Sequence, residues 1–293
     1  MDDSLRVRTL IEILKLSENY LKSKGVQSAR IESEWILQNV LGLSRIDLYL
    51  NFDRPISKDE VEKIRNYISR RGKKEPIQYI LGKTEFMGLP FIVTPKVLIP
   101  RSDTEVIVEK AIEILKQFKN RKTKVLDIGT GSGNIAISIA KYCTGTQITA
   151  IDITLDILKV ARENAKLNKV EDSIRFIEKN FLKNSDLDET FDLIISNPPY
   201  IGNNHYENLP EEIKQWEPKI ALYPGEDELI FYKAITNSYK KFLKHNGHIV
   251  VEIGGDYQLK NVKSIFEMAN LNVIETIFDY TGEARGIIAK NIG

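Results

Sequence analysis

Asn197-Pro198-Pro199-Tyr200 follows the apolar run 191–196 and carries groups that can hold a planar NH2 group. Each proline fixes its own φ at about −65° and moves the preceding residue out of the helical region, so the tetrapeptide should leave a strand as a stiff turn. The Asn197 side-chain oxygen and the Pro198 backbone oxygen could then accept the two hydrogens of an amino group on an sp2 carbon, with the Tyr200 ring on its flat face. We predict substrate contacts from all four residues and catalytic roles for Asn197, Pro198 and Tyr200. An ordinary strand-end turn is the alternative.

A second motif begins with the apolar strand 124–128, which leads into Gly129-Thr130-Gly131-Ser132-Gly133 and then a helical pattern over 135–142. Strand, glycine-rich turn and helix begin a Rossmann-like unit. In the dinucleotide pattern the third glycine would stand at Asn134, so the spacing disfavours NAD. Asp127 would repel a pyrophosphate but suits a ligand with an ammonium or sulfonium group. S-adenosylmethionine carries both cations and is the predicted cofactor.

Asp152 ends the next predicted strand, 147–151, where its carboxylate can accept hydrogen bonds from both ribose hydroxyls. The alternatives are that the glycines only allow a tight turn and that Asp152 only caps a helix starting near Thr154. Because these residues follow successive strands of one βαβ series, they should meet at the edge where open α/β sheets bind ligands. We therefore predict cofactor contacts from Asp127, Gly129, Thr130, Gly131, Ser132, Gly133, Asp152 and Asn197.

The remaining sequence predicts the elements that position these motifs. Amphipathic spacing indicates helices over 5–21 and 28–41, and Ser57-Lys58-Asp59-Glu60 is typical of a capping box before a third. We predict an all-α domain at 1–74 and a β-hairpin linker at 75–98. The catalytic domain at 99–293 should contain a helix from Thr104 to Phe118, capped by Ser102 or Asp103, a mostly parallel sheet of α/β class, and a C-terminal antiparallel hairpin at 273–279 and 286–290.

Composition disfavours several classes of protein. The net charge of +1 gives no global nucleic-acid signature, so we expect no direct nucleic-acid binding. The single cysteine, Cys143, excludes an internal disulfide, and with three histidines it makes no zinc spacing, so we expect no metal. No apolar run approaches the ~18 residues of a membrane span. The expectation is a soluble, cytoplasmic monomer.

The segment 124–133 together with Asn197 to Tyr200 resembles the class I S-adenosylmethionine-dependent methyltransferases that act on planar amino nitrogens. Further segments are similar to those of the HemK/PrmC family of protein-(glutamine-N5) methyltransferases, at 75–82, 98–105, 217–222 and 279–285. The resemblance covers essentially the whole chain. It implies methylation of the side-chain amide nitrogen of the glutamine in the Gly-Gly-Gln motif of class I peptide chain release factors, which modulates translation termination, with S-adenosylhomocysteine as the other product.

The resemblance also implies roles for residues that the motifs alone do not assign. Asn180 and Phe181 should lie at the adenine, and the helical domain should dock the release factor. The chain departs from the family at Asn180, where an acid is common, and at Glu228, where a glycine is often found. Arg101 could contact the substrate or the cofactor, or form a surface salt bridge with Asp103 or Glu105.

Two other functions remain open from the sequence. A DNA or RNA adenine-N6 or other amino-group methyltransferase would present the same planar NH2 group to the tetrapeptide, but it must also hold a polyanion, which the near-neutral charge argues against. A cofactor-binding regulator with an inactive site would bind S-adenosylmethionine without methyl transfer. The intact Asn197 to Tyr200 turn weakens that second alternative.

Overall fold

The computed structural model describes residues 8–118 and 121–293. By internal contacts the chain divides into two compact units, one that ends at Gly82 and one that runs from Lys83 to Gly293. This division falls later than the boundary predicted after residue 74. Within the described part of the chain, no helix has the length and apolar character needed to cross a bilayer.

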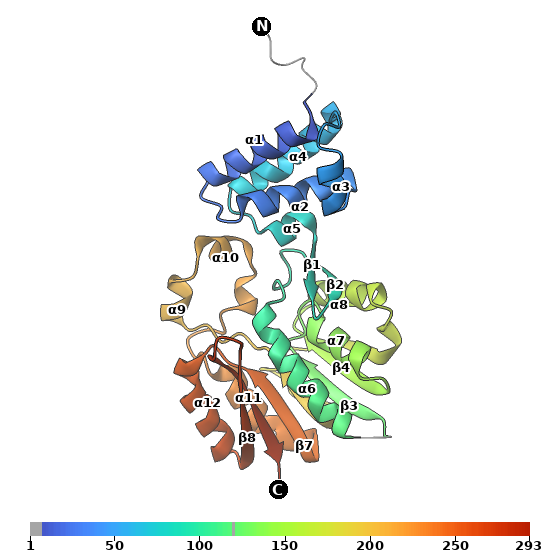
Figure 1. The fold of residues 1–293 in the computed structure, drawn as a ribbon. Helices are drawn as coiled ribbons and strands as arrows, with labels where there is room; N and C mark the ends of the chain where they lie inside the picture. The colour runs from blue at the N-terminus through green and yellow to red at the C-terminus, as the bar shows by residue number, and fades with distance from the viewer. Residues whose placement is uncertain (1–7, 119–120) are drawn as a thin grey trace. The chain divides into compact units, whose positions relative to one another are not determined.

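The N-terminal unit is helical over its described residues, and its elements are α1 (Leu10–Ser23), α2 (Ala29–Leu41), α3 (Arg45–Leu50), α4 (Lys58–Gly72) and α5 (Ile77–Leu81) (Figure 1). Buried residues of these helices, such as Leu10, Leu37 and Ile64, share one apolar core. The predicted capping box is present, with Ser57 Oγ accepting from the Glu60 N–H. Helices α3 and α5 were not predicted because one turn of helix is too short to show a periodic pattern.

The predicted hairpin linker is a hairpin only in its middle part. β1 (Lys83–Phe86) and β2 (Leu89–Ile92) pair antiparallel, whereas 77–81 forms α5. The hairpin is held to α8 (Leu155–Leu167) by the buried Asn164 side chain, which accepts from the Ile92 N–H at 2.6 Å and donates to the Ile92 carbonyl at 2.9 Å. These two bonds fix the chain just before residues 96–104, which approach the candidate site described below.

The C-terminal unit contains a seven-stranded sheet of order β5-β4-β3-β6-β7-β9-β8. Its strands are β3 (Thr123–Ile128), β4 (Thr146–Asp152), β5 (Ile174–Glu178), β6 (Phe191–Ser196), β7 (Leu243–Glu252), β8 (Leu271–Phe278) and β9 (Ala284–Asn291). Strands β3 to β7 pair in parallel, and β9 pairs antiparallel with both β7 and β8. The predicted α/β class, the mostly parallel sheet and the C-terminal antiparallel hairpin are confirmed.

Both faces of this sheet are covered by helices. Val125 belongs to a core with α6 (Glu105–Gln117) and α7 (Asn134–Tyr142), whereas its neighbour Leu126 belongs to a core with α11 (Ile230–Ser238) and α12 (Asp256–Met268) (Figure 1). Successive strand residues point to opposite faces, which explains why the central strands are almost continuously apolar. Because both faces are covered, polar groups that bind a ligand must lie at the ends of the strands.

Shorter elements complete the C-terminal unit. They are α9 (Asn203–Glu207), α10 (Glu211–Trp216) and the 3-10 helices η2 (Ser102–Thr104), η3 (Glu171–Ser173), η4 (Lys219–Ala221) and η5 (Tyr239–Lys241). The helix predicted from Thr104 begins as η2 and continues as α6, and Thr104 stands at its N-cap position without a side-chain capping bond. The expected cap by Ser102 or Asp103 is therefore wrong, because the 3-10 turn already occupies these residues.

Candidate active site

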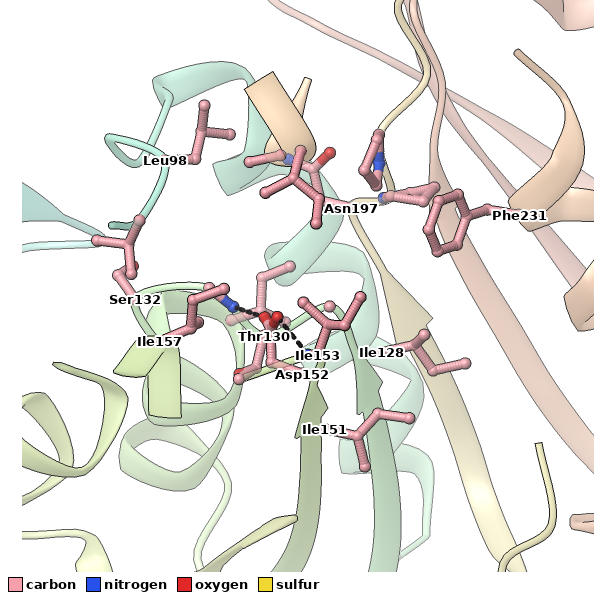
Figure 2. Close-up of a pocket in the computed structure, with 18 of the residues that line it drawn as sticks. Leu98, Ile128, Thr130, Ser132, Ile151, Asp152, Ile153, Ile157, Asn197 and Phe231 are labelled. Atoms are coloured by element: carbon pink, nitrogen blue, oxygen red, sulfur yellow. Dashed lines mark hydrogen bonds between the residues drawn. The ribbon is translucent and has the colours of Figure 1, made fainter. Parts of the chain in front are cut away.

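A cavity of about 240 Å³ lies at the carboxyl ends of β3, β4 and β6 (Figure 2). Parallel α/β sheets bind ligands at this edge. The predicted site residues that line the cavity are Arg101, Gly129, Thr130, Gly131, Ser132, Asp152, Asn180, Phe181, Asn197, Pro198 and Pro199. Asp127, Gly133 and Tyr200 do not contribute to its lining. The fold thus brings most of the predicted residues together around one hollow.

The glycine loop has the left-handed backbone that its composition favours. Gly129, Gly131 and Gly133 have φ angles of 75°, 57° and 82°. At Gly133, the N-cap of α7, an added Cβ would lie 3.0 Å from Ile137 Cδ1 and 3.2 Å from Ala161 Cβ. Gly133 is therefore explained by its turn and by the close approach of α8, and its direct contact with a cofactor stays a prediction.

Asp152 is held by two backbone N–H groups rather than used as a helix cap. Its Oδ2 accepts from the Gly131 N–H at 2.8 Å and its Oδ1 from the Ile153 N–H at 2.7 Å, as the dashed lines in Figure 2 show. The cap of α8 is instead Thr154, whose hydroxyl accepts from the Ile157 N–H at 3.4 Å. Each Asp152 oxygen keeps a further lone pair that can accept a ribose hydroxyl.

Asp127 is a fully buried carboxylate beneath the glycine loop. Its Oδ2 accepts from the Thr130 hydroxyl at 2.6 Å, and its Oδ1 has no partner among the described residues. The pKa of Asp127 is raised to about 7, mainly by burial and less by the charge of Asp152, while the Thr130 hydrogen bond acts in the opposite direction. An unpaired buried carboxylate favours a nearby cation. The unpaired Oδ1 therefore fits a ligand with a positive group at this loop.

The wall of the cavity around Asp152 is apolar. Phe181 is 5% exposed and contacts Phe242 edge to face, with ring centroids 6.1 Å apart. Ile151, Ile153 and Ile157 lie on the same side of the hollow as Asp152 (Figure 2). An apolar wall beside a carboxylate suits a purine nucleoside, whose base has flat apolar faces and whose ribose carries hydroxyl groups.

The Asn197 side chain is held by a residue from a distant part of the chain. Its Nδ2 donates to Thr104 Oγ1 at 3.1 Å, which leaves Oδ1 as an acceptor for an incoming N–H group. One residue earlier, the Ser196 hydroxyl donates to the Ile128 carbonyl at 2.7 Å and fixes the end of β6. Pro198 and Pro199 line the cavity directly after it.

Tyr200 anchors the tetrapeptide to the end of β7. Its hydroxyl donates to Glu252 Oε1 at 3.1 Å, and its carbonyl accepts from Gln258 Nε2 at 2.8 Å. Its ring lies against Gly254, where an added Cβ would be 3.0 Å from Tyr200 Cδ2. Burial raises the pKa of Tyr200 well above its usual range, and the charge of Glu252 adds to this effect. The predicted contact of this ring with a substrate stays a prediction.

Arg101 lines the cavity and forms an ion pair with Glu217. Glu217 is 6% exposed, and its second oxygen accepts from the Ile99 N–H at 3.4 Å. The alternative of a surface salt bridge with Asp103 or Glu105 is wrong, because the acid that Arg101 contacts lies 116 residues away. The pair connects the segment before α6 to the segment after α10.

Several residues at the site were not found from the sequence. Thr104, Tyr223 and Phe231 line the cavity, and the Glu252 carboxylate contacts Tyr200. A signal existed for Glu252, which is an acid at the end of an apolar strand like Asp127 and Asp152. No pattern in the sequence distinguishes Tyr223 or Phe231 from core aromatics. Among the described residues, no group of three or more acids, histidines or cysteines is arranged to hold a metal ion.

Comparison with protein families gives two matches. The family model described as the PrmC N-terminal domain matches residues 12–82, and the one described as the methyltransferase small domain matches residues 108–214. The first match coincides with the helical unit and the second with the part of the sheet that carries the glycine loop and the tetrapeptide.

Curated relatives are similar over most of the chain. A release factor glutamine methyltransferase of Fusobacterium nucleatum subsp. nucleatum is 41% identical over 96% of this chain and 78% of its own length. A protein of the same name from Geobacter sulfurreducens is 41% identical over 87% of both chains. Among solved structures, a methyltransferase from Pyrococcus furiosus matches 78% of this chain and 99% of its own with a TM-score of 0.52 at 19% identity, which supports the fold alone.

Proposed function

Because the chain belongs to the family of release factor glutamine methyltransferases, we propose that it transfers a methyl group from S-adenosylmethionine to the side-chain amide nitrogen of the glutamine in the Gly-Gly-Gln motif of class I release factors. The observation that carries the proposal is one cavity with Asp152 at one end and Asn197 at the other. The Asp152 carboxylate can bind the ribose of the methyl donor, and the Asn197 side-chain oxygen can bind the amide of the substrate. Because both lie in one cavity, donor and substrate can bind side by side (Figure 2).

The residues at the donor end fit S-adenosylmethionine. Asp152 would accept the ribose hydroxyls, Phe181 and Asn180 would lie at the base, and the loop from Gly129 to Ser132 would surround the methionine part, with the Asp127 charge beneath it. When bound, the donor supplies an electrophilic methyl group on a sulfonium sulfur. S-adenosylhomocysteine is the expected product, and the chain needs no metal for this reaction.

The residues at the acceptor end orient a poor nucleophile. A carboxamide nitrogen has its lone pair delocalised into the carbonyl, so positioning must provide most of the catalysis. Asn197 Oδ1 and the Pro198 carbonyl would accept the two N–H hydrogens and direct the nitrogen toward the methyl group. Orientation of this kind can contribute up to about 7–11 kcal/mol. After attack the nitrogen is strongly acidic, and it loses its proton to water or to a carbonyl oxygen.

The relatives do not favour the two alternatives left open by the sequence. Their names describe methylation of release factor glutamine, and neither a nucleic-acid substrate nor a regulator without activity. A cytoplasmic location, a monomeric state and the absence of nucleic-acid binding stay predictions.

One assay tests the proposed function. The purified protein is incubated with methyl-labelled S-adenosylmethionine and a class I release factor, and the methyl group is located by peptide mass spectrometry. We expect label on the glutamine of the Gly-Gly-Gln motif and none on a release factor in which that glutamine is alanine. An adenine-containing DNA duplex serves as the competing substrate. Label on the duplex, or label elsewhere on the release factor, would contradict the proposal.

We also propose that the N-terminal unit docks the release factor. Around α3, Ile46 and Leu50 are each 72% exposed and Phe52 is 54% exposed, so three large apolar side chains face solvent within seven residues. Leu50→Ser should raise the KM for release factor and leave the KM for the methyl donor unchanged. Met268→Ser, which removes a 74% exposed side chain from α12, is the matched control. An unchanged KM for release factor in Leu50→Ser would oppose docking through this surface.

A further inference from the structure

Gln258, in the first turn of α12, has a buried side-chain amide that joins two stretches of backbone beside the cavity. Its Nε2 donates to the Tyr200 carbonyl at 2.8 Å, and its Oε1 accepts from the Gly254 N–H at 2.9 Å. The first bond holds the end of the tetrapeptide, and the second holds the turn between β7 and α12. Gln258 does not line the cavity, so any effect on methyl transfer must pass through these partners.

Both partners of this amide are backbone groups whose polarity cannot change. A carbonyl only accepts and an N–H only donates, so the amide satisfies both partners in a single orientation. A flipped amide would place its oxygen against the Tyr200 carbonyl and its NH2 group against the Gly254 N–H. Because buried polar groups are costly to leave unpaired, the side chain is held in the orientation that donates to Tyr200.

The tetrapeptide itself offers few hydrogen bonds that could fix its backbone. Pro198 and Pro199 have no N–H, and the Pro198 carbonyl is the proposed acceptor for the substrate. The segment must therefore be fixed mainly from its two ends. At the first end, the Ser196 hydroxyl donates to the Ile128 carbonyl at 2.7 Å and ties the chain to β3.

The second end is fixed at the peptide group between Tyr200 and Ile201. Its carbonyl accepts from Gln258, and its N–H donates to the Leu222 carbonyl at 3.0 Å. Because a peptide group is planar, bonds to its carbonyl and its N–H together set the direction of the whole plane. The Tyr200 hydroxyl adds a bond to Glu252 Oε1 at 3.1 Å. Of the two bonds to the plane, only the one from Gln258 is made by a side chain and can be removed by substitution.

We infer that Gln258 is a positioning residue for methyl transfer, which fixes the Tyr200 carbonyl and, through the chain, the direction of the Pro198 carbonyl. Each proline fixes its own φ, so few rotations remain between these two carbonyls, and a rotation at Tyr200 moves Pro198 as well. The inference rests on the proposed function, in which the Pro198 carbonyl accepts one N–H of the substrate amide.

A structural alternative is that Gln258 only stabilises the turn before α12, and Gln258→Glu separates the two roles. The introduced side chain has the same length, and its oxygen can still accept from the Gly254 N–H. An ionised carboxylate cannot donate to the Tyr200 carbonyl, whereas a protonated carboxyl can. Burial should raise the pKa of the introduced carboxyl. The variant should therefore regain the bond to Tyr200 as the pH falls.

The test measures kcat at saturating methyl donor and release factor between about pH 5.5 and 8.5. Gln258→Met has a similar length, no donor and only a weak acceptor, and should lower kcat roughly 10- to 100-fold at every pH, because small misplacements of reacting groups cost this much. Gln258→Glu should be slow at the upper pH and recover most of kcat, relative to wild type, at the lower pH. The Kd for S-adenosylmethionine should stay within about twofold of wild type in both variants.

Asn291→Asp is the matched control for an acid in place of a buried amide. Asn291 is 5% exposed, and its Nδ2 donates to the Leu243 and Lys244 carbonyls at 3.3 and 3.1 Å, at the opposite end of β7 from Gly254. In Asn291→Asp and Gln258→Glu alike, the raised pKa of the carboxyl contributes stability that is present below its unfolded pKa and is lost as the pH rises through its folded pKa. Only Gln258→Glu should lose kcat over the same pH range.

The outcomes are distinguishable. Wild-type kcat in Gln258→Met, or a Gln258→Glu enzyme whose kcat relative to wild type is the same at both ends of the pH range, would overturn the inference and leave the proposed function intact. Loss of donor binding in both variants, or an equal pH-dependent loss of kcat in Asn291→Asp, would assign Gln258 to the fold alone and also overturn it. If the wild-type protein transfers no methyl group to the release factor, the proposed function fails instead. A slow Gln258→Met enzyme that binds the donor normally, beside a Gln258→Glu enzyme that recovers at low pH, would support positioning by Gln258.

Discussion

The two ends of the cavity are assembled from the chain in different ways. At the donor end, Asp127 in β3 and the glycines of the loop that follows form one short segment, and Asp152 bonds Gly131 across 21 residues. At the acceptor end, Asn197 is held by Thr104 across 93 residues and Tyr200 by Glu252 across 52. The donor end is therefore largely local in sequence, whereas the acceptor end depends on three separate segments.

This difference is also one of chemistry. The donor end holds its key acid with the backbone N–H groups of Gly131 and Ile153, which no side-chain substitution removes directly. The acceptor end is held by two separate side-chain hydrogen bonds, from Asn197 to Thr104 and from Tyr200 to Glu252, and a single substitution can break either one. Binding of the donor and transfer of the methyl group should consequently be separable by mutation, with transfer the more fragile property.

Asn197→Ala should show this separation with the largest effect. Loss of the amide oxygen removes one of the two proposed acceptors, and we expect kcat to fall roughly 10²–10³-fold. The Kd for S-adenosylmethionine, measured by calorimetry, should change much less than kcat, because Asp152 and the glycine loop, which supply most of the predicted donor contacts, are untouched. Near-wild-type kcat in this variant would show that the tetrapeptide does not hold the substrate amide.

Asp152→Ala should give the opposite pattern. It removes the proposed ribose acceptor and frees the Gly131 and Ile153 N–H groups that now donate to it. With charged hydrogen bonds worth about 1.5–3 kcal/mol each, the Kd for the donor should rise roughly 10- to 100-fold. At saturating donor kcat should recover most of its wild-type value. A variant that binds the donor normally would place the ribose elsewhere.

The local character of the donor end is the reason it could be predicted. Asp127, the glycines and Asp152 all lie in a strand, turn and helix pattern, and this pattern can be recognised from the spacing of nearby residues. The sheet and its terminal hairpin were predicted for the same reason, because short apolar runs bounded by turn residues mark strands directly. Of the predicted residues in this region, only Asp127 and Gly133 lie outside the cavity lining.

The acceptor end could be predicted only in part. The tetrapeptide is recognisable, but its partners depend on which strands are neighbours, and the order β6-β7-β9 cannot be read from spacing. The partners of Arg101 and Asn197 were missed for this reason, since Glu217 and Thr104 are distant in sequence. The short helices α9 and α10 were missed because one or two turns carry no clear period.

The smallest expected effect is that of Asp127 ionisation on the affinity for the methyl donor, and it further tests the contrast between the donor and acceptor ends. Burial raises its pKa to about 7, so near neutral pH a fraction of the protein holds this acid uncharged. A cationic donor favours the charged form, and its affinity should rise as the pH increases through about 7, by up to about tenfold per pH unit below that value. The stability of the free protein should change in the opposite direction, because the raised pKa favours folding below the unfolded value and this contribution is lost as the pH rises through about 7.

Calorimetric titration of wild type and Asp127→Asn between pH 6 and about 8.5 measures the effect on donor affinity. A pH-independent affinity in wild type would mean that Asp127 does not act on the donor's charge, and the donor end would then depend on backbone groups and Asp152 alone.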